Sequence, residues 1–389
     1  MLPRVEARGD GLPAAPAGGP APAPPSARHL ATAVLCFAAV RALGLVVLAL
    51  WSAARGRSAH ALLSQRWDSL WYVRVVEQGY DFTLTAPGGR TLSDMAFFPL
   101  LPWLEGLLSR ITPLSPGDAG LLVSAVSSLA AAAGIYATVQ SVGRARTAFF
   151  TVVLWAALPV GVVQSMAYSE SLFTALAAWA LYAVLKERWL LAGLLATCAG
   201  LTRPTGLAVA CAVVVAAVVR ARRGGVGADA VAGVALAPLG ACAYVLWVGT
   251  RTGGLFGYLA VQHGWGNGFD GGLAFAAFVA SLMHGAAIPA GIALVAGVGL
   301  LLHAYRAGFR AGLPAPLQVY AGLILALALC SSGYFGSKPR LLMPAFTILV
   351  PIASRLARCR PRVALAISGT AALGSALYGA FWLNGSGPP

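Results

Sequence analysis

The sequence predicts an all-α polytopic membrane protein, and three observations support this fold class. Hydrophobic residues make up 59% of the 389 residues and charged residues only 10%, whereas a typical soluble chain carries about 25% charged residues. The mean hydropathy is +0.78. Apolar runs of about 15 to 25 residues alternate with short arginine-bearing loops, which is typical of membrane-spanning helices. The alternating segments of about ten residues that would indicate a membrane β-barrel do not occur.

The first 28 residues differ from the rest of the chain. They are rich in Pro, Ala and Gly and lack an apolar core, so residues 1–28 are expected to be a disordered cytoplasmic tail and not a cleaved signal peptide. Residues 29–389 are expected to form a single transmembrane domain.

Twelve apolar runs follow this tail, and eleven of them are predicted to span. The run at 95–112 is the exception, because Pro99 and Pro102 interrupt it and Glu105 lies in its middle. We expect it to lie along the outer membrane surface, within a first outer loop at 54–116 that carries interfacial helices. The predicted spans are 30–53, 117–142, 147–166, 171–185, 189–202, 205–219, 229–250, 285–303, 317–334, 340–354 and 363–383.

This assignment sorts the charges. The basic short loops around 144–146, 186–188, 220–223, 306–310 and 355–362 all fall on one side, which the positive-inside rule makes the cytoplasm. Eight of the 12 acidic residues fall on the other side. A transporter would hold its polar groups near the bilayer midplane, often in paired repeats, and no repeat is found. Polar chemistry at one end of the bundle favours an enzyme of the outer membrane surface.

The stretch RWDSLWYVRVVEQGYDF at 66–82 is the first such polar cluster. Trp67, Leu70, Trp71 and Val75 have helical spacing, which predicts an amphipathic helix anchored in the interface by its tryptophans. Asp68 has two interpretations. It is either the N-cap of that helix or a catalytic carboxylate held at the membrane surface.

Several segments resemble the PIG-V family of mannosyltransferases, which has the GT-C membrane glycosyltransferase fold. They are WDSLWYVRVVEQGYDF followed by AFFPLLPWL, then VVQSMAYSESLF at 162–173, AGLTRPTG at 199–206 and KPRLLMPAF at 338–346. The resemblance runs from about residue 30 to 350. It implies a GT-C-like bundle and a sugar donor, with mannose as the sugar, linked to polyprenyl phosphate. It also implies an active site on the outer face in which Asp68 is the acidic residue of the first outer loop. The acceptor is left open, because nothing in the chain indicates a glycosylphosphatidylinositol precursor.

Glycosyl transfer from a lipid phosphate needs a general base for the acceptor hydroxyl, but the phosphate leaving group needs no acid. Asp68 is the candidate base, with inversion at the sugar carbon, and Asp94 is the second candidate, unless it only shapes a turn. Glu170 is expected to bind the acceptor hydroxyl or orient a cation, the alternative being a helix-start acid that favours the helix dipole. Trp67, Tyr72 and Tyr168 are expected to contact substrate.

Cations should hold the donor phosphate. Arg203, at the Pro204 break between two short apolar runs, and the pair Lys338 and Arg340 are the candidates. The alternatives are snorkelling to lipid headgroups for Arg203 and interfacial anchoring for the pair.

The segment VQHGWGNGFD at 261–270 adds a Gly-rich outer loop. His263 and Trp265 could contact sugar hydroxyls, and the glycines would allow a mobile lid; His263 could equally be plain polar surface. The six cysteines have no metal-ligand spacing, and no acidic pair or histidine cluster does either. We therefore predict a metal-independent enzyme without a cofactor.

The expected partners are a polyprenyl-phosphate sugar donor, a lipid or glycan acceptor and membrane lipids, with no nucleic acid. The expected location is the plasma membrane, with the active site on its extracytoplasmic face. A lipid-linked sugar flippase is the alternative function, and a non-catalytic membrane scaffold is the third.

Overall fold

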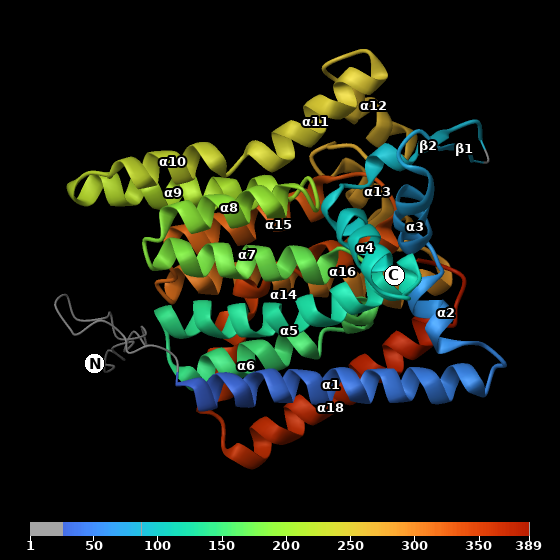
Figure 1. Cartoon of the computed structure of the whole chain (residues 1–389). Coiled ribbons are helices and arrows are strands. Elements are labelled where there is room, and N and C mark those ends of the chain that lie inside the picture. Colours follow the sequence, from blue (N-terminus) through green and yellow to red (C-terminus); the bar gives the residue numbers. More distant parts are fainter. Residues whose placement is uncertain (1–25, 87, 389) are drawn as a thin grey trace, which may run out of the picture.

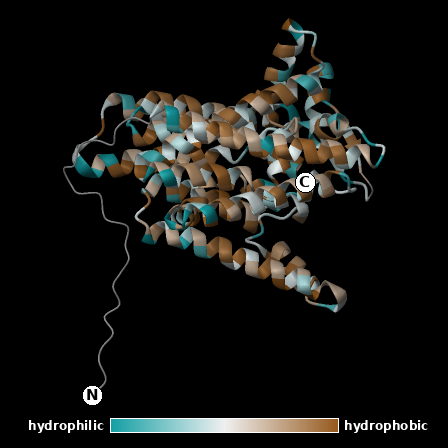
Figure 2. Ribbon diagram, turned by 90° about the horizontal axis from the view of Figure 1, so that it is seen from below, coloured by the Kyte–Doolittle hydropathy of each residue, from teal (hydrophilic) through white to brown (hydrophobic). Residues whose placement is uncertain are grey.

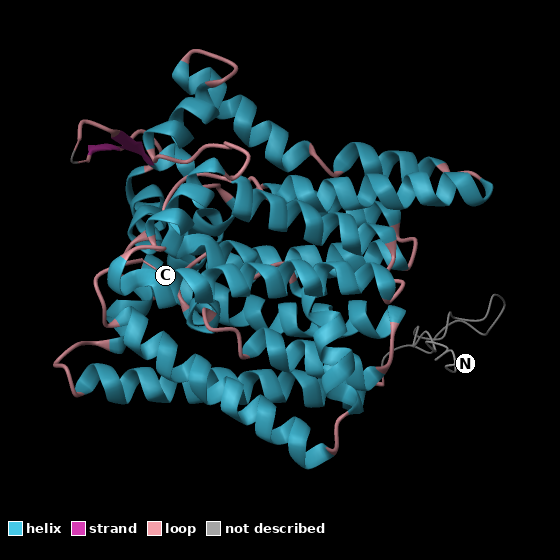
Figure 3. Ribbon diagram, turned by 180° about the vertical axis from the view of Figure 1, so that it is seen from behind, coloured by secondary structure: helices cyan, strands magenta, loops and turns pink. Residues whose placement is uncertain are grey.

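The computed structural model describes residues 26–86 and 88–388, which form helices and one small hairpin (Figures 1 and 3). Most of the tail predicted at 1–28 lies outside the described residues. The first helix, α1, begins at Ala27, inside the predicted tail.

Helix α1 leads into the predicted first outer loop, which contains several short elements. The strands β1 and β2 pair antiparallel, with Thr83 opposite Ser93, so the loop 54–116 is folded throughout most of its length. Its elements, with α1, are α1 (Ala27–Ala53), α2 (Ala59–Ser64), α3 (Asp68–Gln78), β1 (Thr83–Thr85), β2 (Thr91–Ser93), η1 (Asp94–Ala96) and α4 (Leu100–Ile111).

The middle of the chain forms the densest part of the bundle. Its elements are α5 (Pro116–Val142), α6 (Ala145–Ala156), η2 (Gly161–Ser165), α7 (Glu170–Leu185), α8 (Trp189–Gly200), α9 (Gly206–Gly224), α10 (Ala228–Leu236) and α11 (Leu239–Thr252). Helices α8 and α10 approach each other through Gly193 and Gly233, where a Cβ on either residue would overlap backbone of the other helix. Small residues allow this spacing between helices in membranes.

The C-terminal part completes the bundle. Its elements are α12 (Gly257–Gly264), α13 (Leu273–Ser281), η3 (Gly285–Ala287), α14 (Ile288–Arg310), α15 (Ala315–Cys330), η4 (Phe335–Ser337), α16 (Lys338–Leu342), η5 (Phe346–Leu349), α17 (Val350–Arg358) and α18 (Pro361–Leu383). The last helix, α18, packs along the first, α1 (Figure 1). Helices α16 and α17 are bent by 75° across a short break.

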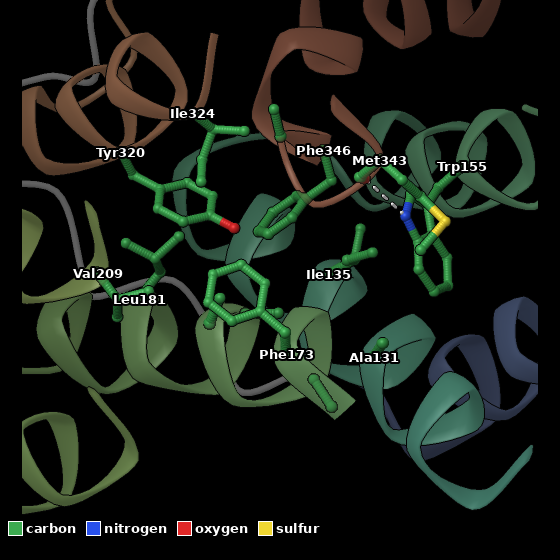
Figure 4. Close-up of a cluster of buried hydrophobic side chains, with 14 of the residues drawn as sticks. Ala131, Ile135, Trp155, Phe173, Leu181, Val209, Tyr320, Ile324, Met343 and Phe346 are labelled. Carbon is green, nitrogen blue, oxygen red and sulfur yellow. Dashed lines mark hydrogen bonds between the residues drawn. The ribbon is translucent and has the colours of Figure 1, made fainter. Parts of the chain in front are cut away.

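The core of the bundle consists of large apolar side chains from helices far apart in sequence. In Figure 4, Tyr320 of α15 and Phe346 of η5 face Phe173 of α7. The indole of Trp155 donates a hydrogen bond of 3.1 Å to the carbonyl of Met343. These contacts hold the segment around 338–346, which carries one of the sequence motifs, against α6 and α7.

The outside of the bundle is apolar as well. Hydrophobic residues run along the helices in Figure 2, and Leu35 and Leu300 are exposed by 69% and 71%. Together with the helix lengths, this defines an integral membrane protein.

Within the described residues, five helical segments are long and apolar enough to span: Ala27–Ala53, Pro116–Val142, Ala228–Thr252, Gly285–Arg310 and Pro361–Leu383. The bent pair α16 and α17 with its 3₁₀ turns could be a sixth, and α6, α7, α8 and α15 are shorter apolar helices. The segment predicted as one span at 147–166 is divided into α6 and η2. The count of eleven spans stays a prediction.

The two ends of the bundle differ in chemistry. Arg146 donates to the carbonyl of Cys359 at 3.0 Å, and Glu187 pairs with Arg220, so four of the predicted cytoplasmic loops are joined in two pairs. The hairpin, α3 and α4 lie at the end of the bundle opposite these loops (Figure 1). The fold thus keeps the polar outer-loop motifs away from the basic loops.

Helix α4 shows why 95–112 can lie at this end. Trp103, Leu107 and Ile111, four residues apart, are exposed by 57%, 54% and 69%, while Glu105 is fully buried. The apolar stripe therefore faces outward and the carboxyl group inward, against Gly120 of α5. Burial raises the pKa of Glu105 well above its usual range, which favours a neutral carboxylic acid.

We predict that α4 does not cross the membrane. With the native cysteines replaced, cysteines at the exposed positions Thr85 and Pro113 should both react with an impermeant thiol reagent from outside. A cysteine at Arg223, in the opposite basic loop, should react only after permeabilisation. Reaction of Thr85→Cys and Pro113→Cys from opposite sides would show that α4 spans.

Candidate functional site

Four charged side chains form a connected series of ion pairs at the polar end of the bundle. Nη1 of Arg340 lies 2.6 Å from Oδ2 of Asp68, and its Nε lies 3.3 Å from Oε1 of Glu170. Glu170 also pairs with Arg203. We call Asp68, Glu170, Arg203 and Arg340 the arginine–carboxylate cluster. It contains two acids and two bases, so its charges cancel.

Each member comes from a different part of the sequence. Asp68 is the first residue of α3, and Glu170 is the first residue of α7. Arg203 lies in the turn between α8 and α9, where Pro204 follows it, and Arg340 lies on α16. All four are candidate site residues in the sequence analysis, and the fold brings them together.

The four side chains differ in their access to solvent. The side chain of Glu170 is 1% exposed, that of Arg340 9%, that of Arg203 15% and that of Asp68 25%. Asp68 is therefore the carboxylate of the cluster that an incoming hydroxyl group can reach. Glu170 is enclosed by its two arginines.

Two predicted tyrosines line the same cluster. The guanidinium of Arg340 lies 5.1 Å from the ring centre of Tyr168, and the backbone N–H of Asp68 donates to the Tyr168 hydroxyl at 3.3 Å. Tyr72 is also buried, and its hydroxyl donates to Ser169 at 3.0 Å. Both rings thus fix the segment 168–170 against the start of α3.

The backbone at Trp67 has an unusual conformation, with φ at 53° and ψ at −120°. This region is sparsely populated for residues other than glycine and costs about 1–3 kcal/mol. The guanidinium of Arg66 lies 4.0 Å from the centre of the Trp67 ring.

Trp67 is the N-cap residue of α3, so the alternative of Asp68 as the N-cap is wrong. The carboxylate of Asp68 contacts Arg340 instead.

Other predicted residues have structural contacts. Asp94 is fully buried, and its carboxylate accepts N–H groups of Asp81 and Phe82, the latter at 3.1 Å. Burial raises the pKa of Asp94, and these backbone hydrogen bonds counteract that rise. The ammonium of Lys338 donates to the carbonyls of Ala328 and Ser331 at 2.7 and 2.6 Å. Both residues thus hold loops in place.

The Gly-rich loop at 261–270 packs onto the first outer loop. The indole of Trp265 donates to the carbonyl of Ser93 at 2.9 Å and packs on Trp71 at 4.9 Å between ring centres. Trp265 therefore joins α12 to β2, while His263 is exposed. Among residues 26–86 and 88–388, no three His, Cys, Asp or Glu side chains gather as a metal site. Metal independence stays a prediction.

The arrangement of these helices is that of the GT-C fold, as two comparisons with solved structures show. The chain resembles the crystal structure of ArnT from Cupriavidus metallidurans bound to undecaprenyl phosphate, with a TM-score of 0.52, 19% identity, and coverage of 85% of this chain and 61% of that one. The apo structure of the same protein gives a TM-score of 0.52, 20% identity, and coverage of 85% and 60%. The chain thus spans about three fifths of the length of these proteins.

A family model and one more solved structure are also similar to the chain. A family model described as dolichyl-phosphate-mannose-protein mannosyltransferase matches residues 96–250, less than half of the chain. The oligosaccharyltransferase of Archaeoglobus fulgidus is similar with a TM-score of 0.48, 16% identity, and coverage of 89% and 53%. No curated protein matches the sequence. Membership of the PIG-V family specifically stays a prediction.

The buried part of the cluster yields a stability prediction. Glu170→Gln leaves Arg203 without its partner and removes one of the two charges that balance Arg340. We expect it to lower the free energy of unfolding by about 3–5 kcal/mol, the usual effect of breaking a buried ion pair.

Glu187→Gln is the matched control, because it breaks the exposed pair of Glu187 with Arg220, whose side chains are 58% and 39% exposed. It should cost at most about 1 kcal/mol. Thermal unfolding of both purified variants in detergent measures the difference. Equal midpoints would show that Glu170 does not balance the arginines.

Proposed function

We propose that the chain is a membrane glycosyltransferase. It transfers mannose, a hexose, from a polyprenyl-phosphate-linked donor to a hydroxyl group of a lipid or glycan acceptor. The GT-C fold supports the class of enzyme. The family description at residues 96–250 supports the sugar, and the undecaprenyl phosphate bound to ArnT supports the type of donor.

One observation carries this proposal: a reachable carboxylate at the end of a buried charge cluster. Asp68 is 25% exposed, and the other carboxylate of the cluster is 1% exposed. A general base must come within hydrogen-bond reach of the proton that it accepts. Asp68 meets that condition, whereas Glu170 and Asp94 are enclosed.

The reaction is a single displacement with inversion. The acceptor hydroxyl attacks C1 of the sugar while its proton passes to Asp68, and the bond between C1 and the phosphate oxygen breaks. The electron pair of that bond leaves with the polyprenyl phosphate. Because a phosphate oxygen accepts this charge at neutral pH, one carboxylate is enough.

Arg340 positions the base in this mechanism. Its ion pair with Asp68 fixes the direction of the carboxylate, while Glu170 and Tyr168 hold Arg340 itself. Donor-phosphate binding by Arg203, Lys338 and Arg340 remains part of the proposal. Each of these cations already contacts carboxylate or carbonyl oxygens, so a donor phosphate would have to bind beside those oxygens or displace them.

The active site is proposed to face the outer side of the membrane. The cluster lies at the end of the bundle opposite the basic loops around 144–146, 186–188 and 355–362. Lys and Arg in short loops favour the cytoplasmic side. The enzyme would then bind its polyprenyl-phosphate-linked donor from the outer leaflet.

Replacement of the base tests the mechanism. Asp68→Asn keeps the shape of the side chain but removes its ability to accept a proton. We expect the rate of radiolabelled sugar transfer from a purified polyprenyl-phosphate donor to endogenous lipid to fall by roughly 10²–10⁴-fold. Donor affinity should change little, because the base acts on the transition state.

Asp81→Asn is the control, because Asp81 is a second aspartate of the same loop that pairs with an arginine, Arg251, in an exposed position. It should retain nearly full activity. A flippase would move the labelled donor across the membrane without forming a product. Full transfer activity in Asp68→Asn would refute the role of this residue.

A further inference from the structure

A cavity of about 610 Å³ lies beside the cluster, between the first outer loop and the end of the last helix. Its walls are α2, the turn that precedes α3, and residues 384–386, which follow α18. Arg57 and Arg66 are the charged residues that line it. A volume of this size is in the range of small-molecule binding sites.

The cavity has an excess of positive charge. Arg57 donates to the carbonyl of Asn384 at 2.6 Å, and Arg66 donates to the carbonyls of Leu383 and Gly385 at 2.9 and 3.3 Å. Each guanidinium has five N–H groups, so both retain donors for a ligand. No acidic side chain lines the cavity within the described part of the chain. The C-terminus of a helix offers only about half a negative charge, against two positive charges.

The cavity is joined to the cluster through the turn at 66–69. The hydroxyl of Ser69 donates to the carbonyl of Arg66 at 2.7 Å and accepts its backbone N–H at 3.0 Å. This closed turn places Arg66 at the cavity and Asp68 at Arg340. A ligand held by Arg66 would therefore lie next to the candidate base.

Apolar surface lies beside the cavity. Leu50, near the end of α1, is 69% exposed, and Phe381, near the end of α18, is 58% exposed. These helices pack along each other and lead to the cavity. A ligand with an anionic head and a hydrocarbon tail matches this combination of positive charge and exposed apolar helix.

We propose that this cavity binds the phosphate group of a lipid, held by charge-assisted hydrogen bonds from Arg57 and Arg66. Arginine suits phosphate because its fork of N–H groups matches two phosphate oxygens. The inference rests on the proposed function for the identity of the lipid. Two lipids offer this phosphate: the polyprenyl phosphate of the donor and an anionic phospholipid.

Lipid binding to the full chain tests the site without any transfer reaction. The protein is placed in nanodiscs of phosphatidylcholine and titrated separately with a short-chain polyprenyl phosphate and with phosphatidylglycerol. Native mass spectrometry measures the bound lipid. We expect the double variant Arg57→Gln and Arg66→Gln to lose at least about tenfold in affinity for one of the two lipids.

The single variant Arg57→Gln should lose affinity several-fold. Because Arg57 is exposed, this variant decides the question if the double variant does not fold. Arg110→Gln, an exposed arginine of the same outer loop, should bind both lipids as the wild type does.

A loss for polyprenyl phosphate identifies the donor as the source, and a loss for phosphatidylglycerol identifies the surrounding lipid. Unchanged affinity for both lipids in folded Arg57→Gln and in the folded double variant would overturn the proposal. Asp68→Asn should bind as the wild type does, so a failure here is distinct from a failure of the transfer mechanism.

Discussion

The contact of Arg340 with Asp68 and Glu170 is the interaction on which the site depends. Its two ion pairs connect the start of α3 to the start of α7 through α16, across 170 to 272 positions of sequence. An arginine in this environment is unstable without partners, because burial removes its hydration. The two carboxylates supply that compensation. The segment around 338–346 can therefore lie at the polar end of the bundle, held there also by Met343 and Phe346 in the core.

The charges of the arginine–carboxylate cluster are balanced, whereas those of the neighbouring cavity are not. With its two acids and two arginines balanced, the cluster has no net charge, so a phosphate bound by its arginines must compete with Asp68 and Glu170. At the neighbouring cavity, Arg57 and Arg66 have no carboxylate partner within residues 26–86 and 88–388, so their positive charge is not balanced there. In the proposed transfer reaction, Asp68 of the cluster is the base and the cavity is the anion site.

Much of this could be predicted from the sequence, because charge is rare in an apolar chain. Four polar residues near predicted helix ends stand out in the sequence: Asp68, Glu170, Arg203 and Arg340. The fold class is confirmed. Sequence could not show the side-chain contacts: Lys338 binds the carbonyls of Ala328 and Ser331, and Trp265 packs on Trp71. Their substrate-binding roles stay predictions. The cavity cannot be read from the sequence because its walls are more than 300 residues apart. Arg66 opens the stretch at 66–82, but nothing in that stretch places it beside residues 384–386.

The backbone at Trp67 connects these two places. Arg66 and Asp68 are only two residues apart, yet the first side chain reaches residues 383–385 and the second reaches Arg340. Arg66 precedes α3, and the φ of 53° at Trp67 separates the turn that carries Arg66 from the helix that begins at Asp68. Inversion requires the base and the leaving group on opposite faces of C1. In the proposed mechanism, the strained residue Trp67 lets Asp68 act as the base on one face of the sugar while Arg66 holds the phosphate on the other, which would give a physical reason for keeping the strain.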